Sequence, residues 1–378
     1  MFEVSKDKSL VNVANSILKH FDIKTFHTTY EKLDEVLAKN KGKTIVLTLL
    51  DGLGDTILKE HAEESKFILE NKFDTITSVF PPTTVAATTS VLTGKYPCET
   101  GWLGWRGYFK DQNTIVDMFS SKITGTDNAL LPSTWERYPV KHLKDYINEK
   151  YNEECTVNLM GHTMFEHGKY DAKVFFGKVD EAIKHGYKYI YAYYPDPDAT
   201  LHGYGNYSKE TSNTIKSIND NLEQLVKNNP DVLFISVADH GHIDIKLCSL
   251  DEHSDLYDTL ATPYFCEARA GMINVKKGRE KEFEKKIINR IAKIENIEHS
   301  RRKEIIYTGK ILHLDGDRKY AEKSIMYYKK MGLNAIVKNI PENRQAKVVY
   351  RLLSIYNPDI LVITGHDGMI SNKQKYND

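Results

Sequence analysis

Four short runs of apolar residues stand out along the chain, and polar side chains follow each run directly. The runs cover Thr44–Leu50, Tyr189–Tyr194, Val232–Val237 and Ile360–Thr364. Short, continuous apolar runs that are rich in β-branched and aromatic residues and bounded by Gly or Pro are typical of buried parallel strands. Helical patterns lie between them, for instance over Glu210–Lys227 and Glu280–Glu295. This alternation predicts an α/β fold with a mostly parallel sheet flanked by helices.

The residues that follow two of these runs are suited to metal binding. Asp51 follows the first run, and Asp239 and His240 follow the third. Ligand-binding groups of parallel α/β sheets lie at the carboxyl ends of the strands, which is where these residues fall. Carboxylate oxygens and imidazole nitrogens are common ligands of divalent ions. Two adjacent metal-capable side chains at a strand end have little packing rationale, so we interpret Asp239 and His240 as candidate ligands.

Two further segments carry candidate site residues. Asp198 and His202 are four residues apart, a spacing that places them on one helical turn where they could share a metal ion. A capping role for Asp198 is the alternative. Thr84 lies ahead of an expected helix through Leu92. A hydroxyl at a helix N-terminus can face a phosphate, because free backbone N–H groups and the helix dipole favour an anion there. Threonine is also a common helix cap, so the position of Thr84 alone does not distinguish a phosphate-facing hydroxyl from a cap.

Charge divides the chain into two parts. Among 378 residues, 52 Lys and Arg balance 52 Asp and Glu, so no net field favours nucleic acid or anionic lipid. Residues 301–378, however, hold 15 basic and 8 acidic residues, which leaves 37 basic and 44 acidic residues in 1–300. A highly charged stretch between Lys276 and Lys310 coincides with this shift. We therefore expect two domains, residues 1–300 and 301–378.

The remaining composition excludes several classes of protein. Four scattered cysteines without a CxxC pair argue against a disulfide scaffold and suit a reducing compartment. No apolar stretch approaches 18 residues, and the first residues show no signal-peptide pattern. We expect a cytoplasmic protein with no membrane and no nucleic acid polymer as partner. The sequence leaves the oligomeric state open.

Trp102, Trp105 and Tyr108 could stack on a nucleotide base or pack in the core.

Taken in order along the chain, the candidate residues form a pattern that resembles the type I phosphodiesterase/nucleotide pyrophosphatase family of the alkaline phosphatase superfamily. The resemblance covers roughly residues 10–295. It is carried by Leu50–Gly54, by Phe80–Pro97 with Gly101–Trp105, by Pro197–His202 and by Ala238–Gly241.

The resemblance implies an alkaline-phosphatase-like fold with two divalent ions, usually zinc. Asp51, Thr84, Asp239 and His240 would hold one ion, and Asp198 and His202 the other, with a further histidine from near the family's C-terminus. Thr84 would be the nucleophile that forms a phospho-threonine intermediate on a small phosphodiester or nucleotide substrate. Its neighbour Thr83 is a less suitable choice because of the spacing to Thr93–Gly94. His242 is interpreted as a residue beside the ligands or on the surface.

The family's last ligand segment, of the type His-Gly/Ala-Gly-Leu-Ser/Thr, has no counterpart here. Residues 305–378 instead resemble a fragment of the YabG-type sporulation cysteine peptidase family, a small α/β fragment of Rossmann-like or caspase-like type. The matching segments are Gly309–Asp317, Tyr327–Leu333 and Tyr356–Gly368. The resemblance implies that His366 would act with a cysteine after the next strand. No cysteine follows His366 in this sequence, so we expect it to lack its nucleophile.

Three functional interpretations remain open. The first is a metal-dependent phosphodiesterase. The second is a fragment of a sporulation peptidase. The third is a fusion of the two with impaired catalysis, in which each part lacks its C-terminal piece. A variant of the first has His366 replacing the missing third ligand.

Overall fold

A computed structural model of the chain describes residues 4–164, 170–243, 253–268 and 270–294, and the short segments 311–315, 335–339 and 360–364. The chain forms two compact units. The first contains Met1–Gly107 and Val116–Lys246, and the second contains Tyr108–Ile115 and Leu247–Asp378. The second unit therefore begins well ahead of residue 300, where the charge shift placed the boundary.

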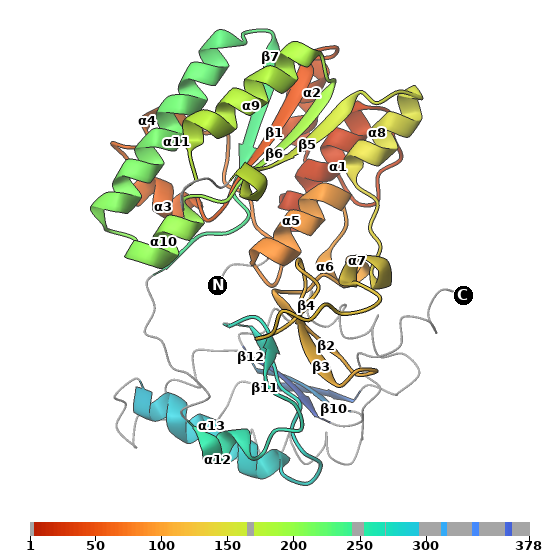
Figure 1. Ribbon diagram of the computed structural model, residues 1–378, viewed down its shortest axis with the longest axis vertical. Helices are drawn as coiled ribbons and strands as arrows, with labels where there is room; N and C mark the ends of the chain where they lie inside the picture. Colours follow the sequence, from red (N-terminus) through yellow and green to blue (C-terminus); the bar gives the residue numbers. More distant parts are fainter. Residues whose placement is uncertain are drawn as a thin grey trace. The chain divides into compact units, whose positions relative to one another are not determined.

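The first unit is built on a four-stranded parallel sheet (Figure 1). Its strands run in the order β5 (Thr156–Met160), β6 (Tyr189–Tyr194), β1 (Thr44–Leu50) and β7 (Val232–Val237). Leu50 pairs with Tyr194, and Leu49 pairs with Val237. The strands β6, β1 and β7 therefore end together, which brings the residues that follow them to one edge of the sheet.

Helices cover both faces of this sheet because alternate strand residues point to opposite faces. On one face, Ile45, Leu47 and Leu49 of β1 pack in a core with α1 (Leu10–His20), α2 (Glu31–Lys39), α5 (Thr84–Thr93) and α8 (Leu143–Tyr151). On the other face, Val46 and Leu50 pack with α3 (Asp55–Glu60), α9 (Ala172–His185), α10 (Asp198–Tyr204) and α11 (Lys209–Asn228). The expected sheet flanked by helices is confirmed.

The other elements of the first unit are short. They are α4 (Lys66–Glu70), α6 (Pro97–Thr100), α7 (Thr134–Arg137), the 3-10 helix η1 (Gly161–Met164), β2 (Arg106–Phe109), β3 (Thr114–Asp117) and β4 (Lys122–Ile123), of which β2 and β3 extend into the second unit. Trp102 is fully buried, lies 4.1 Å from Trp135 between ring centroids, and donates from Nε1 to Tyr138 O at 3.0 Å. Trp102 is therefore a core residue, whereas Trp105 is 48% exposed.

The described residues of the second unit include strands of two sheets and two helices. Strands β8 (Phe265–Cys266) and β9 (Gly271–Met272) pair antiparallel. Helices α12 (Ser254–Tyr257) and α13 (Glu280–Ile294) are joined by Lys286 Nζ, which donates to Asp255 O at 2.7 Å. Strands β10 (Ile311–Asp315), β11 (Ala335–Asn339) and β12 (Ile360–Thr364) form a parallel sheet in the order β11, β10, β12.

All four apolar runs form strands with the predicted bounds, and the two predicted helices appear as α11 and α13. The segments that contain Cys248 and His366 lie outside the described residues. Within the part of the chain that the structure describes, no helix combines the length and apolarity that a membrane crossing requires.

Candidate active site

The candidate site lies at the carboxyl edge of the four-stranded sheet. Asp51 follows β1, Asp198 begins α10 after β6, and Asp239 and His240 follow β7. Thr84 is the first residue of α5, whose ten residues give its N-terminus free backbone N–H groups. The structure thus brings together all six side chains that the sequence predicted, in two groups that each contain possible metal ligands.

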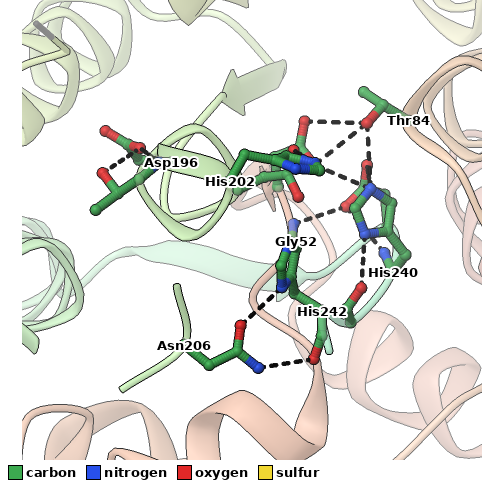
Figure 2. A network of polar contacts seen from close by, with 12 residues as sticks. Gly52, Thr84, Asp196, His202, Asn206, His240 and His242 are labelled. Carbon is green, nitrogen blue, oxygen red and sulfur yellow. Dashed lines mark hydrogen bonds and ion pairs between the residues drawn. The ribbon is translucent and has the colours of Figure 1, made fainter. Parts of the chain in front are cut away.

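The first group consists of Asp51, Asp239 and His240, whose ligand-type atoms all lie within 4.8 Å of one another. His240 Nε2 lies 3.3 Å from Asp51 Oδ1 and 3.5 Å from Asp239 Oδ2. The hydroxyl of Thr84 adjoins this group (Figure 2). Thr84 Oγ1 donates to Asp51 Oδ1 at 3.3 Å and lies 3.2 Å from His240 Nε2. A buried hydroxyl is therefore held between a carboxylate and an imidazole.

Asp239 is the most deeply buried member of the group, with no exposed surface. Its Oδ1 accepts from the backbone N–H groups of Gly52 and His240 at 3.1 and 2.9 Å. Its Oδ2 accepts no hydrogen bond from any described residue. Burial, and then the negative charge of Asp51, raise the pKa of Asp239 well above its usual range. Such an unsatisfied buried oxygen beside a second carboxylate fits a bound cation.

The charges around His240 favour the charged form of its ring. Burial disfavours its charged form, but the hydrogen bond to Asp51 and the charges of Asp239, Asp51 and Asp198 outweigh burial and raise the pKa of His240 to about 10. Tyr193 of β6 donates to Asp51 Oδ2 at 2.5 Å. Burial and the Asp51 charge raise the pKa of Tyr193 far above its usual value, so its phenol stays neutral and orients the carboxylate.

The second group consists of Asp198, His202 and His242, and its ligand-type atoms also lie within 4.8 Å of one another. His202 Nε2 lies 3.4 Å from Asp198 Oδ2, as expected for residues one helical turn apart. The side chain of His202 is 68% exposed, whereas that of Asp198 is 16% exposed. Asp196 fixes the start of α10 by accepting from Thr200 N at 3.1 Å and from Thr200 Oγ1 at 2.9 Å.

Close backbone contacts hold the loops of the two groups against each other. Asp198 N donates to Asp51 O at 3.1 Å. Gly52 has a φ of 72°, and a Cβ on it would lie 2.9 Å from Asp198 Cβ. A Cβ on Gly54 would lie 2.7 Å from Gly241 Cα. Glycine is therefore required at both positions of this loop, at Gly52 for conformation and space and at Gly54 for space alone.

We expect Gly54→Ala to displace the Gly241 segment and to lower both stability and metal affinity. Overpacking a close contact costs about 1–3 kcal/mol of folding free energy. Gly177→Ala in α9 is the matched control, since a Cβ there meets nothing within 4 Å. Thermal unfolding and zinc titration of both variants check this expectation. Gly54→Ala behaving like Gly177→Ala in both measurements would contradict it.

The donor sets of both groups fit divalent ions that accept carboxylate oxygen and imidazole nitrogen, as zinc does. The fit is supported by the unsatisfied Oδ2 of Asp239 and by its place beside a second buried carboxylate, Asp51, in the first group. The ligand roles of Asp51, Thr84, Asp198, His202, Asp239 and His240 stay predictions.

The sequence did not predict the contacts that three residues make in the site. Tyr193 contacts Asp51 because β6 pairs with β1 in a register that sets Tyr193 opposite Leu49. Asn206 contacts His242 through a loop that only the fold brings near. His242 was placed outside the ligand set, although it lies with Asp198 and His202. The sequence offered one signal for this position: His242 lies two residues beyond His240, and the two-ion site lacks one histidine.

Comparisons with known proteins give two separate likenesses. Residues 235–378 match the model of the YabG peptidase U57 family. The sporulation-specific protease YabG of Bacillus subtilis (strain 168) is 46% identical over 67 residues, which are 18% of this chain and 22% of that protein. The match therefore spans about a fifth of that relative's length. The C-terminal likeness expected from the sequence is confirmed. The family match begins inside β7, so it includes Asp239, His240 and His242.

The chain is also similar in structure to murine ectonucleotide pyrophosphatase/phosphodiesterase 5. The match to an inactive variant of that protein in complex with AMP has a TM-score of 0.47 and 16% identity, and covers 64% of this chain and 69% of that chain. A second structure of the same protein matches with a TM-score of 0.48, 17% identity and the same coverage.

Proposed function

We propose that the first unit is a metal-dependent hydrolase that cleaves phosphodiester or nucleotide pyrophosphate bonds with Thr84 as the nucleophile. One observation carries this proposal. The buried Thr84 hydroxyl lies at the N-terminus of α5 and contacts both Asp51 and His240, beside two groups of possible metal ligands. The order of the motifs along the sequence supports the same class of reaction.

The two groups define where ions would bind. Asp51, Thr84, Asp239 and His240 would hold one divalent ion, and Asp198 and His202 would take part in holding the other. When bound, such ions polarise phosphoryl oxygens and stabilise the charge on attacking and leaving oxygens. Zinc is the ion we expect from the mixed carboxylate and imidazole donors.

Thr84 is positioned to attack a phosphorus atom. The free N–H groups and the dipole at the start of α5 favour an anionic phosphoryl group next to its hydroxyl. The bond from Thr84 Oγ to phosphorus forms as the bond to the leaving oxygen breaks, and the hydroxyl proton moves toward Asp51, which already accepts it. Water then attacks the same phosphorus atom, breaks the bond to Oγ and restores the threonine.

A chromogenic assay tests this function. Zinc-loaded protein is expected to release 4-nitrophenol from bis(4-nitrophenyl) phosphate or from the 4-nitrophenyl ester of thymidine 5′-monophosphate. Release should stop when a chelator removes the metal and return when zinc is restored. Absence of release from every phosphoester by the zinc-loaded protein, or full activity after the metal has been stripped, would contradict the proposal.

The match to the YabG peptidase family favours a second candidate function, a fragment of a sporulation peptidase. A cysteine peptidase needs an accessible thiolate. Burial is the main cause that raises the pKa of Cys98 to about 11 and that of Cys266 to about 12, and burial also raises the pKa of Cys155. These three thiols therefore stay protonated. Cys248 and His366 lie outside the described residues. If the phosphoesterase proposal is right, iodoacetamide should leave the release of 4-nitrophenol unchanged.

A further inference from the structure

His242 lies in the second group, although the neighbouring Asp239 and His240 lie in the first. It lies beyond β7 in the segment Asp239–His242, whose first two side chains belong to the first group. Its own ligand-type atom lies within 4.8 Å of those of Asp198 and His202. The rings of His202 and His242 stand nearly perpendicular, at 86°, with centroids 4.8 Å apart (Figure 2). Two imidazoles thus converge on one carboxylate.

We propose that His242 is the third protein ligand of the ion held by Asp198 and His202. This inference rests on the proposed function, since it assigns the ligand that the two-ion site would otherwise lack. The completed set has one carboxylate and two imidazoles. Catalytic zinc sites use three protein ligands of this kind and keep a fourth position for water or substrate. The described residues alone therefore complete the site, and no residue after β12 is required.

The contacts of Asn206 determine which nitrogen of His242 would be free to bind an ion. Asn206 Nδ2 donates to His242 O at 3.3 Å, which places the amide oxygen on the other side. That oxygen, Oδ1, lies 2.7 Å from His242 Nδ1. Because an amide oxygen only accepts, Nδ1 carries the proton and donates. The neutral ring then has its lone pair on Nε2, which is the form that binds a metal.

Asn206 is itself held in place. It is 3% exposed, and its backbone oxygen lies 2.8 Å from Nε2 of His61, which is 5% exposed. A ligating histidine usually donates its second N–H to a carbonyl or carboxylate, which fixes the ring and strengthens the ligand. Asn206 meets this requirement for His242, and His61 fixes Asn206. We therefore assign Asn206 as a positioning residue of the ion.

Metal stoichiometry of purified, zinc-loaded variants tests the assignment without measuring activity. Wild-type protein should hold two ions per chain, and His242→Ala should hold one. His185→Ala is the matched control, because His185 is an exposed histidine in α9. His366→Ala tests the variant interpretation in which His366 replaces the missing ligand, and it should keep two ions. When cobalt(II) replaces zinc, His242→Ala should again bind one ion fewer than the wild type, which is measured as a weaker visible absorption of the bound cobalt.

The outcomes separate this inference from the proposed function. Two ions in His242→Ala at unchanged affinity, or one ion in His366→Ala, would overturn the assignment of His242 and leave the phosphoesterase proposal standing. Wild-type protein that binds no ion would overturn both. If His242→Ala does not fold, Asn206→Leu provides the second test. Asn206→Leu should lower the affinity for the second ion by about 10- to 100-fold. Asn206→Asp keeps the oxygen that accepts from His242 and should retain that affinity. Equal affinity in both Asn206 variants would contradict the positioning role.

Discussion

Thr84→Ala is expected to lower phosphodiester hydrolysis by about 10⁴-fold or more, because removal of a nucleophile removes the covalent route of the reaction. The substitution deletes the hydroxyl that contacts Asp51 and His240 and leaves the rest of the first group in place. Release of 4-nitrophenol under substrate saturation measures the loss. Metal content measured in parallel should show that the site still binds zinc through Asp51, Asp239 and His240.

Two neighbouring variants sharpen this prediction. Thr83→Ala should keep nearly full activity, since Thr83 is the N-cap residue of α5 but its side chain makes no capping hydrogen bond. Thr84→Ser keeps a hydroxyl at the same place and should retain measurable activity. A fully active Thr84→Ala, or a loss of activity in Thr83→Ala equal to that in Thr84→Ala, would overturn the choice of nucleophile.

Removing the metal is expected to lower the unfolding temperature of the protein substantially. Zinc at about 1,000 times its dissociation constant adds about 4 kcal/mol to the free energy of unfolding. For a unit of this size, each kcal/mol shifts the midpoint by about 2–4 °C, so the zinc-loaded protein should unfold roughly 8–16 °C above the stripped protein. Differential scanning calorimetry of both forms measures the difference.

Asp239→Asn should abolish most of this zinc effect. Asparagine has a similar shape and keeps an oxygen for the N–H groups of Gly52 and His240, but it removes one carboxylate from beside Asp51. Stripped of metal, the variant should be at least as stable as the stripped wild type, because a like-charge contact is gone. Asp231→Asn, at an exposed position before β7, is the control and should respond to zinc as wild type does. A full zinc shift in Asp239→Asn would exclude Asp239 as a ligand.

The sequence was sufficient to predict the strands whose ends carry the site. The runs at Thr44–Leu50, Tyr189–Tyr194 and Val232–Val237 form strands with the predicted bounds, since continuous apolar runs of this length favour strands. β1 and β6 are buried as expected, whereas β7, at the end of the strand order, is only partly buried. Because the three strands are parallel and in register, the residues after them had to meet at one edge. That is why Asp51 and Asp239 could be placed in one site without a structure.

The remaining site residues depend on long-range packing that no local pattern records. Asn206 meets His242 across 36 residues of chain, through a loop whose path the helices α10 and α11 determine. Gly54 meets Gly241 only because two strand-end loops cross at van der Waals distance. A histidine two residues beyond a ligand is compatible with several positions, and it is the backbone approach at these glycines that sets His242 beside His202.

We propose above all that two ions bind at the carboxyl edge of the sheet, with Thr84 beside the first of them. Anomalous diffraction from crystals grown with zinc, recorded on both sides of the zinc absorption edge, tests it most directly. We expect two peaks in the first unit, one among Asp51, Thr84, Asp239 and His240, and one among Asp198, His202 and His242. No zinc peak at these residues, in crystals of protein shown to be loaded with zinc, would contradict the account.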